Sequence, residues 1–128
     1  MRRILLVTVL VLAALPAASA SGAAIHHSAN VTIDYEGSGD FSGKVQSSGR
    51  CEKSRKVDLL FNGGITWRPL RTFVVVGSDT TNDSGDWSVD TPAAESGDYK
   101  AKARRKTYNH GGRKHVCDPA TSKKIVFM

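Results

Sequence analysis

The chain has 128 residues, a formal net charge of +6, 40% apolar residues and two cysteines. These values are typical of one globular domain, and they exclude a long disordered chain, a collagen-like protein and a membrane protein with several spans. A chain of this length has room for one hydrophobic core, so we expect a single folded domain.

The first residues have the features of a secretory signal peptide. Arg2 and Arg3 give a positive start, residues 4–15 are almost wholly apolar, and residues 18–20 (Ala-Ser-Ala) offer the small side chains of a cleavage site. The apolar run is shorter than the roughly 20 residues that a membrane-spanning helix needs, so we assign residues 1–20 to a signal peptide and not to an anchor. The mature protein would then be secreted to the extracellular side, without a transmembrane anchor. Its net charge would fall from +6 to +4, because both arginines are removed.

Short strands are the only regular elements that the remaining sequence predicts. Residues 21–30 are small and polar, which predicts a flexible leader before a folded domain at 31–128. Within that domain, apolar residues alternate with polar ones in the pattern of half-buried strands. In chain order, the predicted strands cover residues 31–35, 41–46, 55–61, 65–67, 73–76, 86–90, 99–104 and 125–127. Residues 77–85 and 109–112 are rich in turn-forming residues and predict turns.

These elements predict an all-β fold. No segment after residue 20 keeps a 3.6-residue apolar period over ten or more residues. About seven or eight short strands with regular turns indicate an all-β sandwich or barrel, and their one-sided apolar pattern fits two antiparallel sheets that share one core. In an exported chain, Cys51 and Cys117 are most simply one disulfide, and closing that loop would stabilise the fold by roughly 4 kcal/mol. Two free thiols or a metal pair are the alternatives, and no convincing set of further ligands lies near either cysteine.

A series of short motifs carries a family resemblance. In chain order the motifs are Phe41-x-Gly43-x-Val45, Cys51, Arg55-x-Val57, Gly85-Asp86-Trp87-x-Val89 and Ser96-Gly97-Asp98-Tyr99-x-Ala101. Over about residues 38–127 this series resembles the carboxypeptidase regulatory-like domain, and the cysteine pair is similar to that of its small secreted bacterial members. The resemblance implies a transthyretin-like Greek-key β-sandwich. It also implies an accessory, adhesive or structural module, usually without catalytic residues of its own.

The strongest charged feature is a basic stripe near residue 100. In a strand, Lys100, Lys102 and Arg104 point to one face, and Arg105 and Lys106 stand at its end. Such a stripe could bind a polyanion, for example teichoic acid, a sulfated glycan or a lipopolysaccharide, by charge neutralisation. The alternative is a solvated sheet face whose lysines protect a strand edge from aggregation, which is the commoner role of a charge run. We expect an anionic cell-surface polymer or another envelope protein as partner, and no nucleic acid.

Histidines are a weaker candidate site. His110 and His115 precede Cys117, and His26 and His27 stand together in the predicted leader. Their spacing matches no closed zinc-binding set, and the cysteine is better used in the disulfide. We therefore expect surface histidines without a metal.

An oxygen-rich segment is the candidate for calcium. Asp79, Asn82, Asp83 and Asp86 crowd a segment that contains Gly85. It lacks the alternating ligand spacing and the closing glutamate of a calcium-binding hand loop. The same residue types are what a tight turn needs, so a plain turn is the favoured interpretation.

The sequence gives little support to catalysis. No nucleophile elbow or zinc-protease motif is present, so we predict a protein that is not an enzyme and needs no cofactor. Trp87 is in phase with Val89 and is expected in the core, whereas Trp67 lies in a Gly/Pro-flanked stretch and is the candidate glycan contact. The sequence thus favours a secreted module that binds or supports at the cell envelope. A structural or adhesive envelope component with no ligand is the alternative, and a small secreted hydrolase or metal-binding protein is a remote one.

Overall fold

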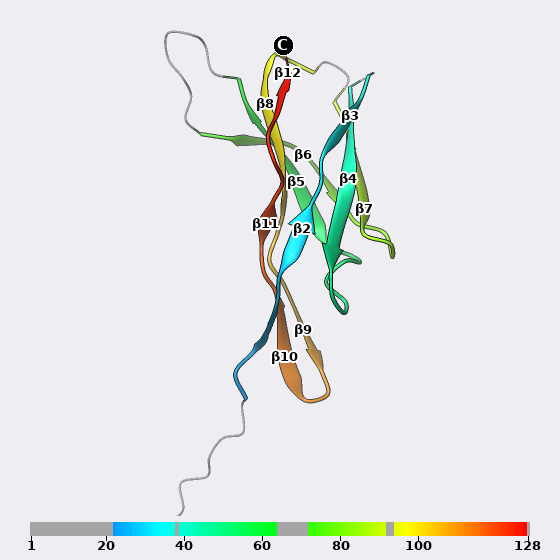
Figure 1. The fold of residues 1–128 in the computed structure, drawn as a ribbon, viewed down its shortest axis with the longest axis vertical. Helices are drawn as coiled ribbons and strands as arrows, with labels where there is room; N and C mark the ends of the chain where they lie inside the picture. Colours follow the sequence, from blue (N-terminus) through cyan, green and yellow to red (C-terminus); the bar gives the residue numbers. More distant parts are fainter. Residues whose placement is uncertain (1–21, 38, 64–71, 92–93, 128) are drawn as a thin grey trace, which may run out of the picture.

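The structure is a computed structural model that describes residues 22–37, 39–63, 72–91 and 94–127 (Figure 1). Among these residues it contains twelve strands and no helix, which confirms the predicted all-β class. The strands are β1 (Ile25–His27), β2 (Ala29–Val31), β3 (Asp34–Glu36), β4 (Asp40–Ser47), β5 (Lys56–Asn62), β6 (Val74–Thr80), β7 (Asp86–Asp90), β8 (Gly97–Ala103), β9 (Lys106–His110), β10 (Arg113–Cys117), β11 (Ala120–Thr121) and β12 (Ile125–Phe127). A helix long and apolar enough to cross a bilayer does not occur in the described part of the chain.

Most strands form a body of two antiparallel sheets. In the first sheet, β4 pairs with β7 along one edge and with β2 and then β3 along the other. In the second sheet, β5 lies between β6 and β8, and β8 pairs further with the short strands β11 and β12. Figure 1 shows the two sheets as facing layers. We call these two sheets the body.

The two sheets of the body share one hydrophobic core. Its buried members are Val31, Phe41, Val45, Val57, Leu59, Trp87, Val89, Tyr99, Ala101 and Ala103. Phe41 and Tyr99 come from opposite sheets, and their ring centroids lie 4.4 Å apart. Gly43 in β4 allows the backbone of Thr32 to approach closely, because a Cβ at that position would lie 2.0 Å from the carbonyl oxygen of Thr32. Burying each large apolar side chain stabilises the fold by about 1.5–3 kcal/mol.

Residues 21–30 were expected to form a flexible leader. That prediction is wrong where the segment forms the paired strands β1 and β2. β1 runs parallel to β10, with Ile25 opposite His115, and β2 pairs with β4, with Ala29 opposite Ser47. The sequence of β1 is Ile-His-His, which shows no alternation of apolar and polar residues. Its strand conformation comes from backbone pairing with a distant segment, which a local pattern does not reveal.

Three further strand boundaries differ from the expected ones. The strand expected at residues 31–35 is interrupted at Thr32, whose hydroxyl oxygen accepts a hydrogen bond from the Lys44 backbone nitrogen at 2.9 Å. β6 continues to Thr80, where a turn was expected from residue 77, because its polar half pairs with β5. β9 covers residues 106–110, part of which was expected as a turn. The count of twelve strands therefore exceeds the expected seven or eight.

Three strands form a second region, which we call the extension. β9 and β10 make a hairpin, and β1 adds to β10 in parallel, so these three strands form one layer that projects from the body (Figure 1). Gly111 and Gly112 form the hairpin turn with φ angles of 61° and 72°, a left-handed conformation that favours glycine. The predicted disulfide is confirmed: it joins Cys51, in the loop after β4, to Cys117 at the end of β10.

Arg55 is the buried polar centre of the junction between body and extension. Its Nε donates to the Arg104 carbonyl oxygen at 2.6 Å, and Nη1 donates to the Cys51 carbonyl oxygen at 3.1 Å. Nη2 donates to the carbonyl oxygens of Cys117 and Asp118. Burial lowers the pKa of Arg55, and the charge of Asp118 opposes that shift. Four carbonyl groups around the disulfide thus satisfy a fully buried cation.

Candidate binding surface on the second sheet and the extension

Buried and more exposed side chains alternate along β8, as the sequence predicted. Tyr99, Ala101 and Ala103 are buried, whereas Lys102 is exposed on the outer face of the second sheet and Lys100 is half-buried. Lys100 Nζ lies 3.9 Å from the centroid of the Phe73 ring, a cation–π contact that leaves its charge unneutralised. Two of the predicted cations thus share this face.

Arg104 is partly neutralised by a carboxylate from β5. Its Nε donates to Asp58 Oδ2 at 2.6 Å, and Ser78 Oγ donates to Asp58 Oδ1 at 2.7 Å. Burial raises the pKa of Asp58, but the hydrogen bonds from Arg104 and Ser78 and the charges of Arg104 and Lys56 outweigh it, so the pKa is lowered. The hydrogen bond to Asp58 also raises the pKa of Arg104. Arg104 is therefore less available to a ligand than Lys102 or Lys100.

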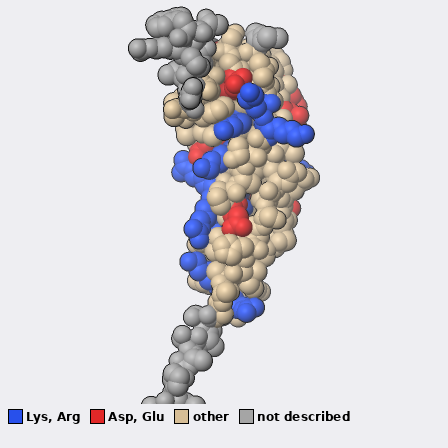
Figure 2. All heavy atoms as spheres, turned by 60° about the vertical axis from the view of Figure 1, so that its left-hand side comes forward, with Lys and Arg blue, Asp and Glu red and all other residues tan. Residues whose placement is uncertain are grey.

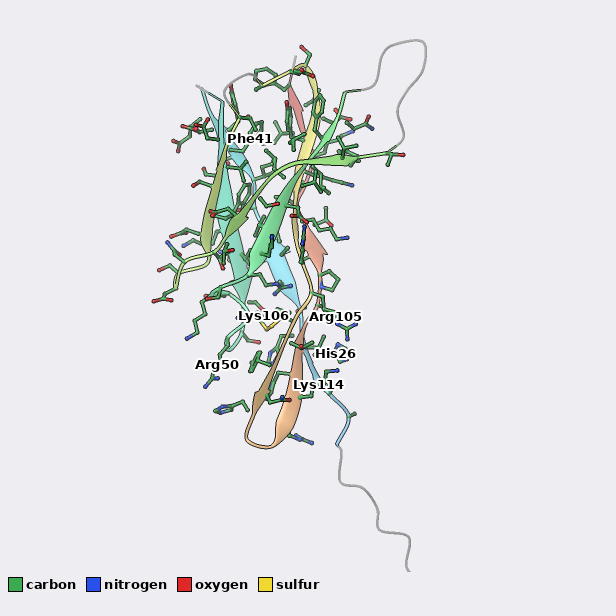
Figure 3. All side chains as sticks on the ribbon, turned by 180° about the vertical axis from the view of Figure 1, so that it is seen from behind. His26, Phe41, Arg50, Arg105, Lys106 and Lys114 are labelled. Carbon is green, nitrogen blue, oxygen red and sulfur yellow. A yellow bond between two sulfur atoms is a disulfide. The ribbon has the colours of Figure 1, made fainter. Side chains whose placement is uncertain are left out.

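The stripe divides after Arg104. Arg105 is exposed, whereas Lys106 turns toward the loop after β4, where its Nζ donates to the carbonyl oxygens of Arg50 at 3.2 Å and Lys53 at 2.8 Å. Burial and the charges of Arg55, Lys53 and Arg50 lower the pKa of Lys106. Figure 3 places Arg105, Lys106, Arg50 and Lys114 around the junction and the extension, far from Phe41 in the body. The five predicted cations therefore do not form a single row.

Charge is nevertheless separated between regions of the chain. Residues 100–114 contain seven Lys or Arg residues and no Asp or Glu. Strands β3, β4 and β7 carry Lys44 and five carboxylates, which are Asp34, Glu36, Asp40, Asp86 and Asp90. Asp40 and Asp90 are cross-strand neighbours, and a hydrogen bond and the charge of Asp40 raise the pKa of Asp90. Figure 2 shows Lys and Arg side chains along one margin of the molecule, from the body to the extension, and also Asp and Glu side chains beside several of them.

Two cations that the sequence reasoning missed extend the basic surface. Lys56 is exposed at the start of β5, where its carbonyl oxygen accepts a hydrogen bond from the Arg104 backbone nitrogen at 2.8 Å. Arg50 is exposed in the loop after β4, and its guanidinium lies 5.8 Å from the centroid of the Tyr108 ring. Both come from segments about 50 residues away from β8, so no local run of charges could have revealed them. We call Lys56, Lys100, Lys102, Arg105 and Arg50 the basic surface.

Histidines from β1 and β10 form a compact cluster on the extension. His27 Nε2 and His115 Nδ1 lie 2.9 Å apart, and the planes of the two rings differ by 16°. Tyr108 stacks on His115 with a centroid distance of 4.7 Å and an interplanar angle of 7°. His27 Nδ1 lies 2.6 Å from Ser48 Oγ. His27 and His115 are 88 residues apart in the sequence, and the parallel pairing of β1 with β10 brings them together.

The other two histidines lie apart from this pair. His110 stands at the end of β9, where Arg50 Nη2 approaches its Nδ1 at 3.4 Å. His26 Nδ1 lies 2.7 Å from Asp118 Oδ1, an exposed contact next to the disulfide. In the described ranges, no group of three or more His, Cys, Asp or Glu residues is placed to hold a metal ion.

The oxygen-rich segment after β6 forms a turn. Asn82 Oδ1 accepts hydrogen bonds from the backbone nitrogens of Ser84 and Asp86, both at 2.9 Å. Asp79 Oδ2 accepts one from the Ser88 backbone nitrogen at 2.8 Å. A shallow hollow of about 260 Å³ lies among these residues, but their oxygens already hold the chain in its turn.

Three expectations lie outside the described residues: the signal peptide at residues 1–20, the strand at residues 65–67, and Trp67 as a glycan contact. Trp87, by contrast, is in the core as predicted. Comparison with family models, with curated proteins and with solved structures found no match for this chain.

Proposed function

We propose that this protein is an exported, non-catalytic module that contacts an anionic polymer of the cell surface through the basic surface. The observation that carries the proposal is the separation of charge. Residues 100–114 contain seven cations and no carboxylate, while β3, β4 and β7 of the first sheet carry five carboxylates. The second sheet also carries Asp58, Asp79 and Asp98, and Asp58 pairs with Arg104. A surface of one sign attracts polyelectrolytes of the other sign, with a strength that falls as salt is added.

We also propose that the body is a Greek-key β-sandwich of the carboxypeptidase regulatory-like type. The strand pairing supports this assignment. β2 and β3 pair with one edge of β4, and β11 and β12 pair with one edge of β8, so each pair counts as a single interrupted strand. The body then has three strand positions in one sheet and four in the other. The β9–β10 hairpin of the extension is an addition between β8 and β11 that the resemblance did not imply, and β1 of the extension precedes β2.

Salt-dependent retention on a sulfated glycan tests the proposed function. Purified protein would be loaded on heparin resin and eluted with a sodium chloride gradient. We expect the double variant Lys102→Gln/Arg105→Gln to elute at lower salt than the wild type. Both side chains are exposed on the basic surface, and neither has a carboxylate partner among the described residues.

A charge-matched control separates a local surface from overall charge. Lys44 and Lys124 are exposed cations outside the basic surface, with Asp86 and Asp98 as their partners, each at 3.5 Å. The variant Lys44→Gln/Lys124→Gln removes the same two charges and should elute close to the wild type. Equal shifts for the two double variants would overturn the proposal, since overall charge would then account for retention.

An exposed edge strand favours a second candidate, attachment to another envelope protein. Among the described strands, β6 pairs with β5 alone. Val74, Val75 and Val76 are 54%, 54% and 42% exposed on it. An edge of this kind can accept a strand from another chain. Chemical cross-linking on intact cells would distinguish the candidates, because a protein partner predicts a cross-linked product that Val75→Lys abolishes and heparin does not displace.

A further inference from the structure

Two half-buried imidazoles of the extension share one hydrogen bond. His27 Nε2 and His115 Nδ1 lie 2.9 Å apart. A neutral imidazole has one N–H and one lone pair, so in this contact one facing nitrogen donates its proton and the other accepts it. If both facing nitrogens carried a proton, they would repel each other at this distance and the contact would be lost.

Neighbouring groups determine where added protons go. Ser48 Oγ lies 2.6 Å from His27 Nδ1, where it can accept the N–H of that ring, so that His27 Nε2 presents its lone pair to His115. Tyr108 stacks on His115 at an interplanar angle of 7° and restricts the rotation of that ring. A first added proton then binds at His115 Nε2 and leaves the hydrogen bond intact. A second proton has only the lone pair of His27 Nε2, inside the contact.

Positive groups face the same side of the extension. Arg50 Nη2 lies 3.4 Å from His110 Nδ1, and the centroid of the His110 ring lies 6.3 Å from that of His115. Lys106 on β9 and Arg113 on β10 are on the face that carries the pair, because side chains alternate along a strand. These groups oppose a further positive charge on the two imidazoles.

The carboxylates of the adjoining segments are engaged elsewhere. Asp118 Oδ1 lies 2.7 Å from His26 Nδ1, on the opposite face of β1 from the pair. Glu52 Oε1 accepts a hydrogen bond from the Ser47 backbone nitrogen at 2.9 Å. Residues 100–117 contain no Asp or Glu. A second proton on the pair therefore gains no carboxylate partner from these segments.

We propose that the hydrogen bond between His27 and His115 is an acid-sensitive latch that holds β1 on β10. The closed pair accommodates one added proton, whereas the two imidazoles of an opened strand take up two. Histidine side chains gain protons between about pH 8 and pH 5, and the state that binds more protons is favoured as the pH falls. Acid therefore shifts the extension toward the form in which β1 is released.

Release of β1 changes one edge of the extension. β1 pairs with β10 through three residue pairs, from Ile25 opposite His115 to His27 opposite Cys117, and so short a strand opens at low cost. The freed edge of β10 then has unpaired backbone donors and acceptors, which can pair with a strand of another chain. The disulfide keeps β10 attached to the body. This device is independent of the proposed polymer contact, because neither histidine belongs to the basic surface.

Hydrogen exchange of the oxidised protein, followed by NMR at pH 8 and pH 5, tests the latch. After correction for the intrinsic effect of pH on exchange, protection of the β1 amides should fall by about 5- to 30-fold at pH 5. This range follows from one extra proton taken up by opened histidines with an ordinary pKa of about 6.5. Protection in β4 should stay unchanged, since the core of the body contains no histidine.

Two glutamine variants and one control separate the latch from a general effect of acid. His27→Gln and His115→Gln should each remove the fall, because a neutral amide that faces one imidazole lets that ring take up a proton without repulsion. His26→Gln is the matched control in the same strand. A proton on His26 faces the carboxylate of Asp118, so acid does not weaken that contact, and His26→Gln should keep the fall.

A milder variant keeps the test decisive if either glutamine variant folds poorly. Ser48→Ala removes the partner of His27 Nδ1 but leaves both imidazoles, so it should lower protection of β1 by a similar factor at both pH values. Protection of β1 that is equal at pH 8 and pH 5 in the wild type would overturn the proposal. So would a fall that persists in both glutamine variants or disappears in Ser48→Ala. Retention on heparin at pH 8 reports separately on the polymer contact.

Discussion

The body buries ten side chains between two sheets, whereas the strands of the extension bury only Val116 and Cys117. Both regions are built from β-strands, but the extension has a single layer and therefore no second sheet to cover its faces. Specific side-chain contacts replace the missing core. Tyr108 stacks on His115, His27 contacts Ser48, and Lys106 donates to two carbonyl oxygens.

This difference assigns different roles to the two regions. A core of close-packed apolar side chains unfolds cooperatively, so the body sets the free energy of unfolding of the whole chain. A single layer with few buried apolar contacts opens locally at a lower cost. The disulfide and Arg55 lie where the regions meet, and they keep the extension attached to the body even when its strands open.

Truncation of a core ring should produce the largest loss. Phe41→Ala removes a fully buried ring that contacts Tyr99 and Tyr35, and we expect the free energy of unfolding to fall by about 3–5 kcal/mol. Urea denaturation followed by tryptophan fluorescence measures the change. Val126→Ala is the control, because Val126 is 59% exposed, and it should change stability by less than about 0.5 kcal/mol. A loss below about 1 kcal/mol for Phe41→Ala would contradict the assignment of the core.

The junction should be nearly as sensitive. Arg55→Lys keeps a positive charge but cannot reach the carbonyl oxygens of Arg104, Cys51, Cys117 and Asp118 together, so we expect a loss of about 2–3 kcal/mol. Hydrogen exchange would show where the loss falls, and we expect faster exchange in β9 and β10 than in β4. Lys53→Arg, an exposed substitution in the same loop, serves as the control. Uniform acceleration across both regions would show that Arg55 stabilises the body and not the junction.

The sequence predicted the body better than the extension for a physical reason. A strand with one buried face alternates apolar and polar residues, and Phe41 with Val45 and Tyr99 with Ala101 show that alternation. β9 buries no apolar face, so its sequence, Lys-Thr-Tyr-Asn-His, carries no such signal. β1 is recognisable only from its pairing with β10.

The candidate sites also combine features that a local sequence pattern predicts with contacts that it does not. The shared face of Lys100 and Lys102 follows from the period of a strand and was predictable. The partner of Arg104 was not, since Asp58 is 46 residues away, nor was the contact of His27 with His115, 88 residues away. Such partners are set by strand register, and a single sequence without recognisable hairpins does not fix register across long connections.

Low pH should remove a stabilising contribution from the outer face of the second sheet, that of the ionised Asp58 side chain. The pKa of Asp58 is lowered in the folded protein, so its ionised form stabilises the fold above the unfolded value of about 4. That contribution is lost as the pH falls through the lowered pKa. We expect Asp58→Asn to cost about 1.5 kcal/mol at pH 7 and progressively less below pH 4, measured by urea denaturation at each pH.

An exposed carboxylate serves as the comparison for this acid-dependent loss. Asp86 pairs with Lys44 at 3.5 Å, and both side chains are about half exposed, so solvent screens the pair. Asp86→Asn should therefore change stability by less than Asp58→Asn at pH 7. If the two variants lose equal amounts, burial of Asp58 next to Arg104 does not set the size of the effect.

The smallest effect should be confined to the tip of the extension. Gly111 has a φ of 61°, and a Cβ built there meets no atom within 4 Å, so Gly111→Ala tests backbone strain alone. We expect a cost of about 1 kcal/mol that appears as faster hydrogen exchange in β9 and β10, with β4 and β5 unchanged. Gly111→Asn should cost less, because asparagine tolerates the left-handed conformation. Equal exchange in the two variants would mean that the turn does not limit opening of the hairpin, and the extension would then open through β1 first.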